Sequence, residues 1–160
     1  MSVFQPIVFR LGKEIYGINI AYVNAIEHGQ EIVRVPNSSG NIKGIINLRG
    51  EIIPVIDLKS KFCMEDKATD IKTDELIIIN LTDNRIALAI DGVEKIYNVT
   101  SDDIRKMPSI AKGAGVTYFT GVVKLDDKLV ILIDPMELLS EEEREAVEKI
   151  IDDNSPSDEE

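Results

Sequence analysis

Apolar and polar positions alternate along most of this chain with the two-residue period of β-strands. Successive side chains of a strand point to opposite faces, so this alternation predicts strands with one buried face. The runs are rich in Ile, Val and Leu and are bounded by the turn residues Gly, Asn, Asp and Pro. Strands are predicted at residues 7–11, 15–20, 32–35, 45–48, 52–56, 76–81, 85–90, 93–99, 116–119, 121–125 and 129–133. Residues 21–26 fit either a helical turn or a bent strand, and the pattern leaves both open.

Helical signals are few. Ser140 followed by Glu143 is a capping box, and it predicts a C-terminal helix over residues 140–151. Residues 152–160 combine acidic residues with Pro, which predicts an acidic disordered tail. Short helical turns are expected at 59–64 and 101–104, and loops at 65–74 and 109–115.

The most distinctive stretch is residues 44–58, which read G-I-I-N-L-R-G-E-I-I-P-V-I-D-L. Two apolar runs flank Arg49, and Gly50 permits the positive φ of a tight hairpin turn. Pro54 has no N–H for a neighbouring strand, so the second strand is expected to be a sheet edge or to carry a bulge there. An exposed Arg on a hairpin with a free edge is typical of a recognition element.

The order of elements repeats within the chain, which indicates an internal duplication. Residues 44–57 align with 121–134 at an offset of 77, and residues 8–26 align with 78–96 at an offset of 70. The copies span about 4–64 and 73–139, and about five short strands in each predict two small barrels.

The two copies differ at the hairpin turn. We expect the residues that both copies share to be framework and those of the first copy alone to serve recognition, Arg49 above all. The differing positions are Arg49, Gly50 and Pro54 in the first copy, and Asp126, Asp127 and Ile131 in the second.

Charge and composition narrow the class of partner. The 160 residues carry 29 acidic and 18 basic side chains, a formal net charge of −11, which disfavours nucleic acid and anionic membranes as partners. The single cysteine, Cys63, excludes an intrachain disulfide. With no apolar run of about 20 residues and no secretory pattern, the sequence predicts a soluble cytosolic protein.

Catalytic signals are weak. His28 and Cys63 are single residues of their type, and they support neither thiol–imidazole catalysis nor a zinc site. No phosphate-binding, dinucleotide-binding or serine-hydrolase motif occurs, so neither a cofactor nor a metal is predicted. The one enzymatic alternative is a small hydrolase in which Asp57 and Asp134 share a proton. The competing interpretation is that each Asp ends a strand and caps the turn that follows.

Residues 44–58 resemble the hallmark motif of the CheW chemotaxis coupling proteins, which a related domain of the histidine kinase CheA also carries. Residues 9–20, 33–37 and 90–93 match in register, and the resemblance covers about residues 4–140. It implies a mainly β fold: one CheW-like domain over residues 1–151, built of two interlocked five-stranded SH3-like barrels packed on each other. Short helical turns and the C-terminal helix complete that fold.

The resemblance also implies a function. It is that of a non-enzymatic adaptor without cofactors, which links the cytoplasmic tips of methyl-accepting chemoreceptors to the regulatory domain of CheA in signalling arrays. Since the chain is essentially this domain alone, we expect the free adaptor and not the kinase. The family implies a monomer when free, cytoplasmic, recruited to membrane receptor arrays through its partners and not inserted in the membrane.

The family's binding residues carry over to two sets of positions in this chain. One departure concerns Ala25, since family members commonly have an acidic residue there. We hypothesise that Glu27 replaces it as the partner of Arg49, with their charged ends within about 4 Å. The receptor-binding set is Val23, Ala25, Glu27, Gly44 and Arg49, and the kinase-binding set is Val93, Arg105 and Gly121.

Overall fold

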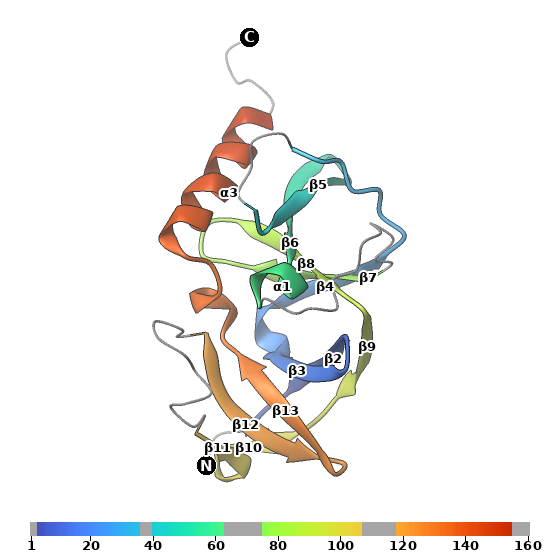
Figure 1. Cartoon of the computed structure of the whole chain (residues 1–160), viewed down its shortest axis with the longest axis vertical. Helices are drawn as coiled ribbons and strands as arrows, with labels where there is room; N and C mark the ends of the chain where they lie inside the picture. Colours follow the sequence, from blue (N-terminus) through green and yellow to red (C-terminus); the bar gives the residue numbers. More distant parts are fainter. Residues whose placement is uncertain (1–2, 36–39, 63–74, 107–117, 155–160) are drawn as a thin grey trace.

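Two curled sheets lie one above the other along the long axis of the molecule (Figure 1). The computed structural model describes residues 3–35, 40–62, 75–106 and 118–154. The first barrel is the five-stranded sheet, in the order β4 (Val23–His28), β7 (Glu75–Asn80), β8 (Arg85–Ile90), β6 (Glu51–Asp57) and β5 (Ile42–Leu48). The second barrel is the six-stranded sheet, in the order β11 (Ile104–Arg105), β12 (Phe119–Leu125), β13 (Lys128–Ile133), β3 (Glu14–Asn19), β2 (Pro6–Leu11) and β9 (Gly92–Ile96). A short pair, β1 (Val3–Phe4) and β10 (Val99–Thr100), adjoins the second barrel.

The helices in the described residues are short except for the last one. They are η1 (Ile20–Tyr22), α1 (Leu58–Lys61), η2 (Ser101–Asp103), η3 (Pro135–Glu137) and α3 (Glu141–Asn154). The ambiguous stretch 21–26 forms both predicted structures, a helical turn followed by a strand. The predicted strand 32–35 is reduced to a single bridge between Val33 and Ile45. The loops predicted at 65–74 and 109–115 lie outside the described residues.

The C-terminal helix is longer than predicted. Residues 152–154 were expected in the disordered tail, and they form the last turn of α3 instead. The reason is local, because the first residue that blocks a helix after Ile151 is Pro156, and the residue before a proline also avoids helical geometry. The capping box is present as predicted, since Ser140 Oγ accepts from the Glu143 N–H and Glu143 Oε1 accepts from the Ser140 N–H.

Each barrel combines strands from both sequence copies. The hairpin β5–β6 of the first copy joins β7–β8 of the second, through parallel pairing of β6 with β8. Reciprocally, the hairpin β12–β13 joins β2–β3, through parallel pairing of β13 with β3. The two copies have therefore exchanged hairpins, and this makes the barrels interlocked.

The registers of the two barrels match residue for residue, which supports the duplication. Val55 faces Ala87 in the first barrel, and the equivalent Leu132 faces Gly17 in the second. The hairpins share a bulge as well. Pairing shifts between Ile42 and Gly44 in β5 and between the equivalent Phe119 and Gly121 in β12.

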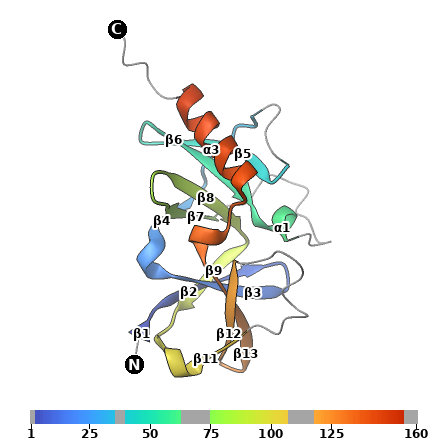
Figure 2. The same cartoon turned by 90° about the vertical axis from the view of Figure 1, so that its left-hand side faces the viewer.

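The described residues form three apolar clusters. One lies inside the first barrel and includes Ile46, Val55 and Ile78, and a second lies inside the second barrel around Val123. The largest lies between the barrels and extends beneath α3, where it buries Val147. Figure 2 shows α3 against the first barrel, beside β6, although it follows strands of the second.

The prediction that Pro54 marks a sheet edge or a bulge is wrong. β6 is an internal strand between β8 and β5, and the register shift in its pairing with β5 lies between Ile42 and Gly44, not at Pro54. Ile45, which faces Pro54, exchanges both backbone hydrogen bonds with Val33 at 2.8 Å each. The nitrogen of Pro54 therefore points away from β5. Pairing with β8 begins only at Val55, so the missing N–H of Pro54 breaks no ladder bond.

Candidate functional site

The tip of the β5–β6 hairpin holds an arginine in an unusual backbone conformation. Leu48 faces Glu51, which leaves Arg49 and Gly50 as a two-residue turn with φ of 53° and 90°. Positive φ at both positions is the geometry of a type I′ turn, which suits the twist of a hairpin. Left-handed geometry is unfavourable for a residue with a Cβ by roughly 1–2 kcal/mol, so the turn alone does not favour Arg here. The Arg49 side chain is 77% exposed.

Glu27 is the partner of Arg49, as hypothesised from the sequence. Arg49 Nη2 lies 3.6 Å from Glu27 Oε2, and the Glu27 side chain is only 15% exposed. The contact ties the hairpin tip to β4 at the far edge of the same sheet. Because Arg49 is largely solvated, we attribute less than about 1 kcal/mol of stability to the pair. Its main effect is to orient the guanidinium.

The other members of the receptor-binding set are less exposed, with Val23 and Ala25 half-buried and Gly44 buried. Val23 packs on the core between the barrels, and Ala25 packs on the interior of the first barrel. Gly44 is buried, and a Cβ there would clash with the carbonyl oxygen of Val33. Of the five predicted residues, Arg49 alone is exposed.

Val33 is an exposed residue of this region that the sequence did not single out. It is 53% exposed and lies across Gly44, where its backbone pairs with Ile45. The sequence predicted it within a strand, and the outward-facing position in V-R-V-P was the signal available. The backbone at Val33 crosses Gly44, so the exposed Val33 side chain adds apolar surface to the first barrel.

The kinase-binding set has the same division between framework and surface. Gly121 is buried beneath β11, since a Cβ there would meet Ile104 Cγ2 at 2.7 Å and the Arg105 carbonyl oxygen at 3.0 Å. Val93 packs on the core between the barrels, and its N–H donates to Glu75 Oε1 at 2.7 Å. Arg105 is the exposed member. Gly44 and Gly121 thus have the same structural role: the absence of a side chain lets another segment pass close over the strand, at Val33 in the first barrel and at β11 in the second.

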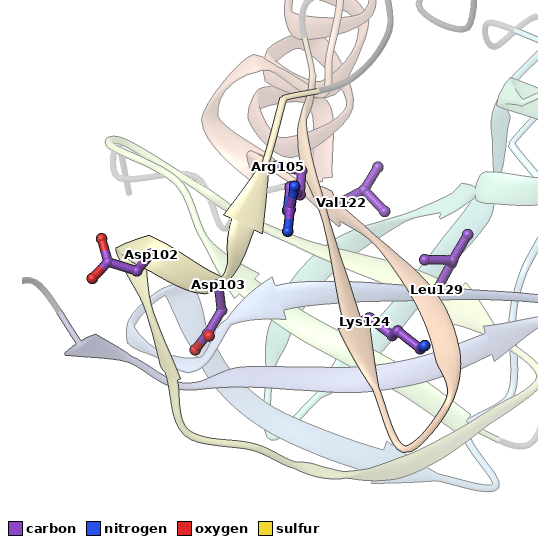
Figure 3. A pocket seen from close by; sticks show the side chains of 6 residues that line it. All are labelled: Asp102, Asp103, Arg105, Val122, Lys124 and Leu129. Carbon is purple, nitrogen blue, oxygen red and sulfur yellow. The ribbon is translucent and has the colours of Figure 1, made fainter.

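Arg105 lines a surface groove on the second barrel (Figure 3). The groove has a volume of about 480 Å³, and Leu129 on its wall is 67% exposed. Figure 3 shows four of the labelled side chains projecting from β11, β12 and β13, and Asp102 and Asp103 projecting from η2, with Asp102 pointing away from the rest. Exposed apolar and Arg side chains side by side are typical of protein interfaces. The lining residues are Asp102, Asp103, Arg105, Val122, Lys124 and Leu129.

The two symmetric carboxylates are structural caps. Asp57 Oδ1 accepts from the Ser60 N–H at 3.3 Å at the start of α1, and Asp134 Oδ1 accepts from the Met136 N–H at 3.0 Å at the start of η3. This confirms the capping interpretation and leaves the hydrolase alternative without support. Among the described residues there is no cluster of three or more His, Cys, Asp or Glu suited to a metal, and Cys63 lies outside them. None of the described helices is long and apolar enough to cross a membrane.

Known proteins resemble this chain over most of its length. The model of the CheW-like domain family matches residues 5–143. Chemotaxis protein CheW of Klebsiella aerogenes is 35% identical over 90% of this chain and 86% of its own length, and that of Treponema pallidum is 32% identical over 88% and 84%. The crystal structure of the scaffolding protein TtCheW from Thermoanaerobacter tengcongensis matches with a TM-score of 0.75 at 32% identity, covering 83% of this chain and 90% of that one. The chain belongs to the CheW-like domain family.

Proposed function

We propose that this protein is a non-enzymatic chemotaxis adaptor that couples chemoreceptor cytoplasmic tips to the histidine kinase CheA. The observation that carries the proposal is the match to the CheW-like domain family over residues 5–143, with curated relatives that are chemotaxis proteins CheW. The hydrolase alternative is dropped, because both of its carboxylates are engaged as caps. The free protein is a cytoplasmic monomer in this proposal and joins membrane receptor arrays through its partners.

The first barrel is assigned to the receptor. Its hairpin tip presents Arg49, oriented by Glu27, and the apolar side chain of Val33 is exposed on the same barrel. A guanidinium with five donors suits a helical tip that offers carboxylates or carbonyl oxygens. In this proposal the half-buried Val23 and Ala25 complete the surface beside Arg49, and the buried Gly44 holds β5 close to Val33.

The second barrel is assigned to the regulatory domain of CheA. Its groove combines the exposed Leu129 with the cations Arg105 and Lys124. Burial of an apolar side chain supplies affinity, and the flanking charges supply orientation and specificity. Gly121 and Val93 position this surface from below.

The division of labour is tested by measuring two affinities for each variant. Isothermal titration with a receptor-tip fragment and with the CheA regulatory domain is run on the intact protein and on Arg49→Ala and Arg105→Ala. We expect Arg49→Ala to weaken receptor binding by about tenfold and leave kinase binding unchanged, and Arg105→Ala to do the reverse. Lys13→Ala is the control, because it removes a cation from an exposed hairpin turn outside both sets. Equal loss of both affinities in one variant would indicate misfolding, and no loss in either would refute the assignment.

A further inference from the structure

The tip of the second hairpin repeats the backbone geometry of the first. Asp126 and Asp127 form a two-residue turn between Leu125 and Lys128, with φ of 50° and 65°. Asp tolerates the left-handed region better than most residues, which allows this turn without a glycine. Asp126 therefore occupies the place that Arg49 has in the first barrel.

Asp126 also makes a contact to its own barrel. The Tyr97 hydroxyl donates to Asp126 Oδ2 at 2.8 Å, and Lys95 Nζ lies 3.6 Å from the same oxygen. The ring of Tyr97 packs on the interior cluster of the second barrel, and Lys95 lies over it, 4.7 Å from its centroid. The ring is thus held from both sides, with its hydroxyl directed at the hairpin tip.

Strand registers identify this contact as the counterpart of the Glu27–Arg49 pair. In β4, Val23 faces Ile79 and Ala25 faces Ile78 across a bulge, and in β9 the equivalent Val93 faces Phe9 and Lys95 faces Val8 across the same bulge. Two residues further along, Glu27 faces Leu76.

The register continues to Tyr97. Its N–H bonds to the Pro6 carbonyl oxygen at 3.1 Å, and Pro6 is the equivalent of Leu76. Glu27 and Tyr97 are therefore equivalent positions, as are Arg49 and Asp126. The same tip-to-strand contact exists in both copies with its chemistry exchanged: a cationic tip on a carboxylate, and an anionic tip on a phenol.

The pKa values of Asp126 and Tyr97 are shifted in the directions expected for this hydrogen bond. The hydrogen bond from Tyr97 and the nearby charge of Lys95 hold the pKa of Asp126 below its usual value. The same hydrogen bond to the carboxylate raises the pKa of Tyr97. At neutral pH the donor therefore keeps its proton and the acceptor stays charged, which is the state that the contact needs.

We propose that Tyr97 and Asp126 form a latch that positions the β12–β13 hairpin, and with it Lys124 and Leu129, for binding the kinase domain. This inference rests on the proposed function for its partner, and on the geometry alone for the latch. The hairpin carries three of the lining residues of the groove, Val122, Lys124 and Leu129, so its angle to β11 sets the shape of that surface. Tyr97 is a positioning residue, since it lies outside the groove lining.

The perturbation is Tyr97→Phe, which removes the hydroxyl and keeps the packed ring. Hydrogen exchange of the free protein is followed at the amides of both hairpin tips, residues 124–129 and 47–52. We expect exchange at 124–129 to rise by about three- to tenfold and exchange at 47–52 to stay unchanged. Glu27→Gln is the mirror variant, and it is expected to show the opposite pattern.

The same variant is titrated with the CheA regulatory domain and with the receptor-tip fragment. We expect Tyr97→Phe to weaken kinase binding by about three- to tenfold and to leave receptor binding unchanged. Asp127→Asn is the matched control, because it removes an adjacent charge that is 97% exposed. The ion pair of Asp127 with Lys124, at 4.0 Å between two exposed side chains, contributes little. This control variant is expected to resemble the unmodified protein in both measurements.

Each failure has a different meaning. Unchanged exchange at 124–129 in Tyr97→Phe would overturn the latch, as would an equal rise in Asp127→Asn. Raised exchange with undiminished kinase binding would overturn the positioning role. If the unmodified protein did not bind the kinase domain, the proposed function would fail together with the positioning role, while the exchange experiment would still decide the latch.

Discussion

Replacing Glu143 by Gln removes a negative charge from a nearly closed site between α1, β5 and α3. Lys61 Nζ lies 2.6 Å from Glu143 Oε1, and the two side chains are 8% and 6% exposed. Asn41 Nδ2 donates to Glu143 Oε2 at 2.6 Å. The Ser140 N–H donates to Glu143 Oε1 at 2.9 Å as part of the capping box. Burial disfavours the charged carboxylate, but these hydrogen bonds outweigh it and hold the pKa of Glu143 below its usual value.

The magnitude follows from what the substitution leaves behind. Glu143→Gln keeps the size of the side chain and leaves the buried Lys61 ammonium without a counter-charge, which costs about 3 kcal/mol. For a chain of this length that corresponds to a fall in Tm of about 6–12 °C. Adding Lys61→Met removes the stranded charge, so the double variant should recover about 2 kcal/mol relative to the sum of the single ones.

Urea denaturation followed by circular dichroism measures these free energies of unfolding. Glu142→Gln is the matched control, because it removes the same charge from an exposed position one residue away. The contribution of Glu143 is present above the usual carboxyl pKa and is lost as the pH falls through its lowered value, so Glu143→Gln should be less sensitive to acid. A loss below about 0.5 kcal/mol, or strictly additive single variants, would refute the reasoning.

Three further predictions concern the framework. Asp91 accepts from Lys59 Nζ at 2.9 Å and from the Gly12 N–H at 2.6 Å, so Asp91→Asn should lower the free energy of unfolding by about 2 kcal/mol. Its pKa is lowered because those bonds outweigh burial, so the difference should vanish at low pH in a urea titration repeated across pH. Gly44→Ala should destabilise by about 1–3 kcal/mol through its clash with Val33, whereas Gly40→Ala, whose Cβ meets nothing within 4 Å among the described residues, should be neutral in thermal unfolding. Asp134→Ala should cost about 1 kcal/mol as a lost cap, measured by the same method, and an equal stability would contradict the capping role.

Local structure was largely predictable from the sequence, because it depends on periods and turn residues within a few positions. Alternation located the strands, Ser140 and Glu143 located the last helix, and Gly50 located the hairpin turn. Alternation says nothing about which strand pairs with which, so the parallel contact of β6 with β8 depends on tertiary packing. The prediction for Pro54 was wrong for this reason, since the effect of its missing N–H depends on where the pairing of β6 with β8 begins.

The candidate site was predictable only in part. Comparison of the copies singled out Arg49, and its ion pair with Glu27 followed from the two-residue period of β4. The groove at Leu129 and the contact of Tyr97 with Asp126 could not be predicted, because they depend on how the second barrel closes. The glycines were assigned to binding sets, and their structural role emerges only from the segments that cross them.

The exchanged hairpins have a consequence for stoichiometry. Since β5–β6 completes the barrel begun by β7–β8, and β12–β13 completes the one begun by β2–β3, neither copy contains a whole barrel. Cleavage or truncation between the copies would remove a partner strand from both barrels at once. Under the proposed function, a chain truncated between the copies would lose both attachment surfaces, whereas a single substitution such as Arg49→Ala would affect only one. Under that proposal a truncated adaptor would bind neither partner, and each intact molecule would contribute one of each surface.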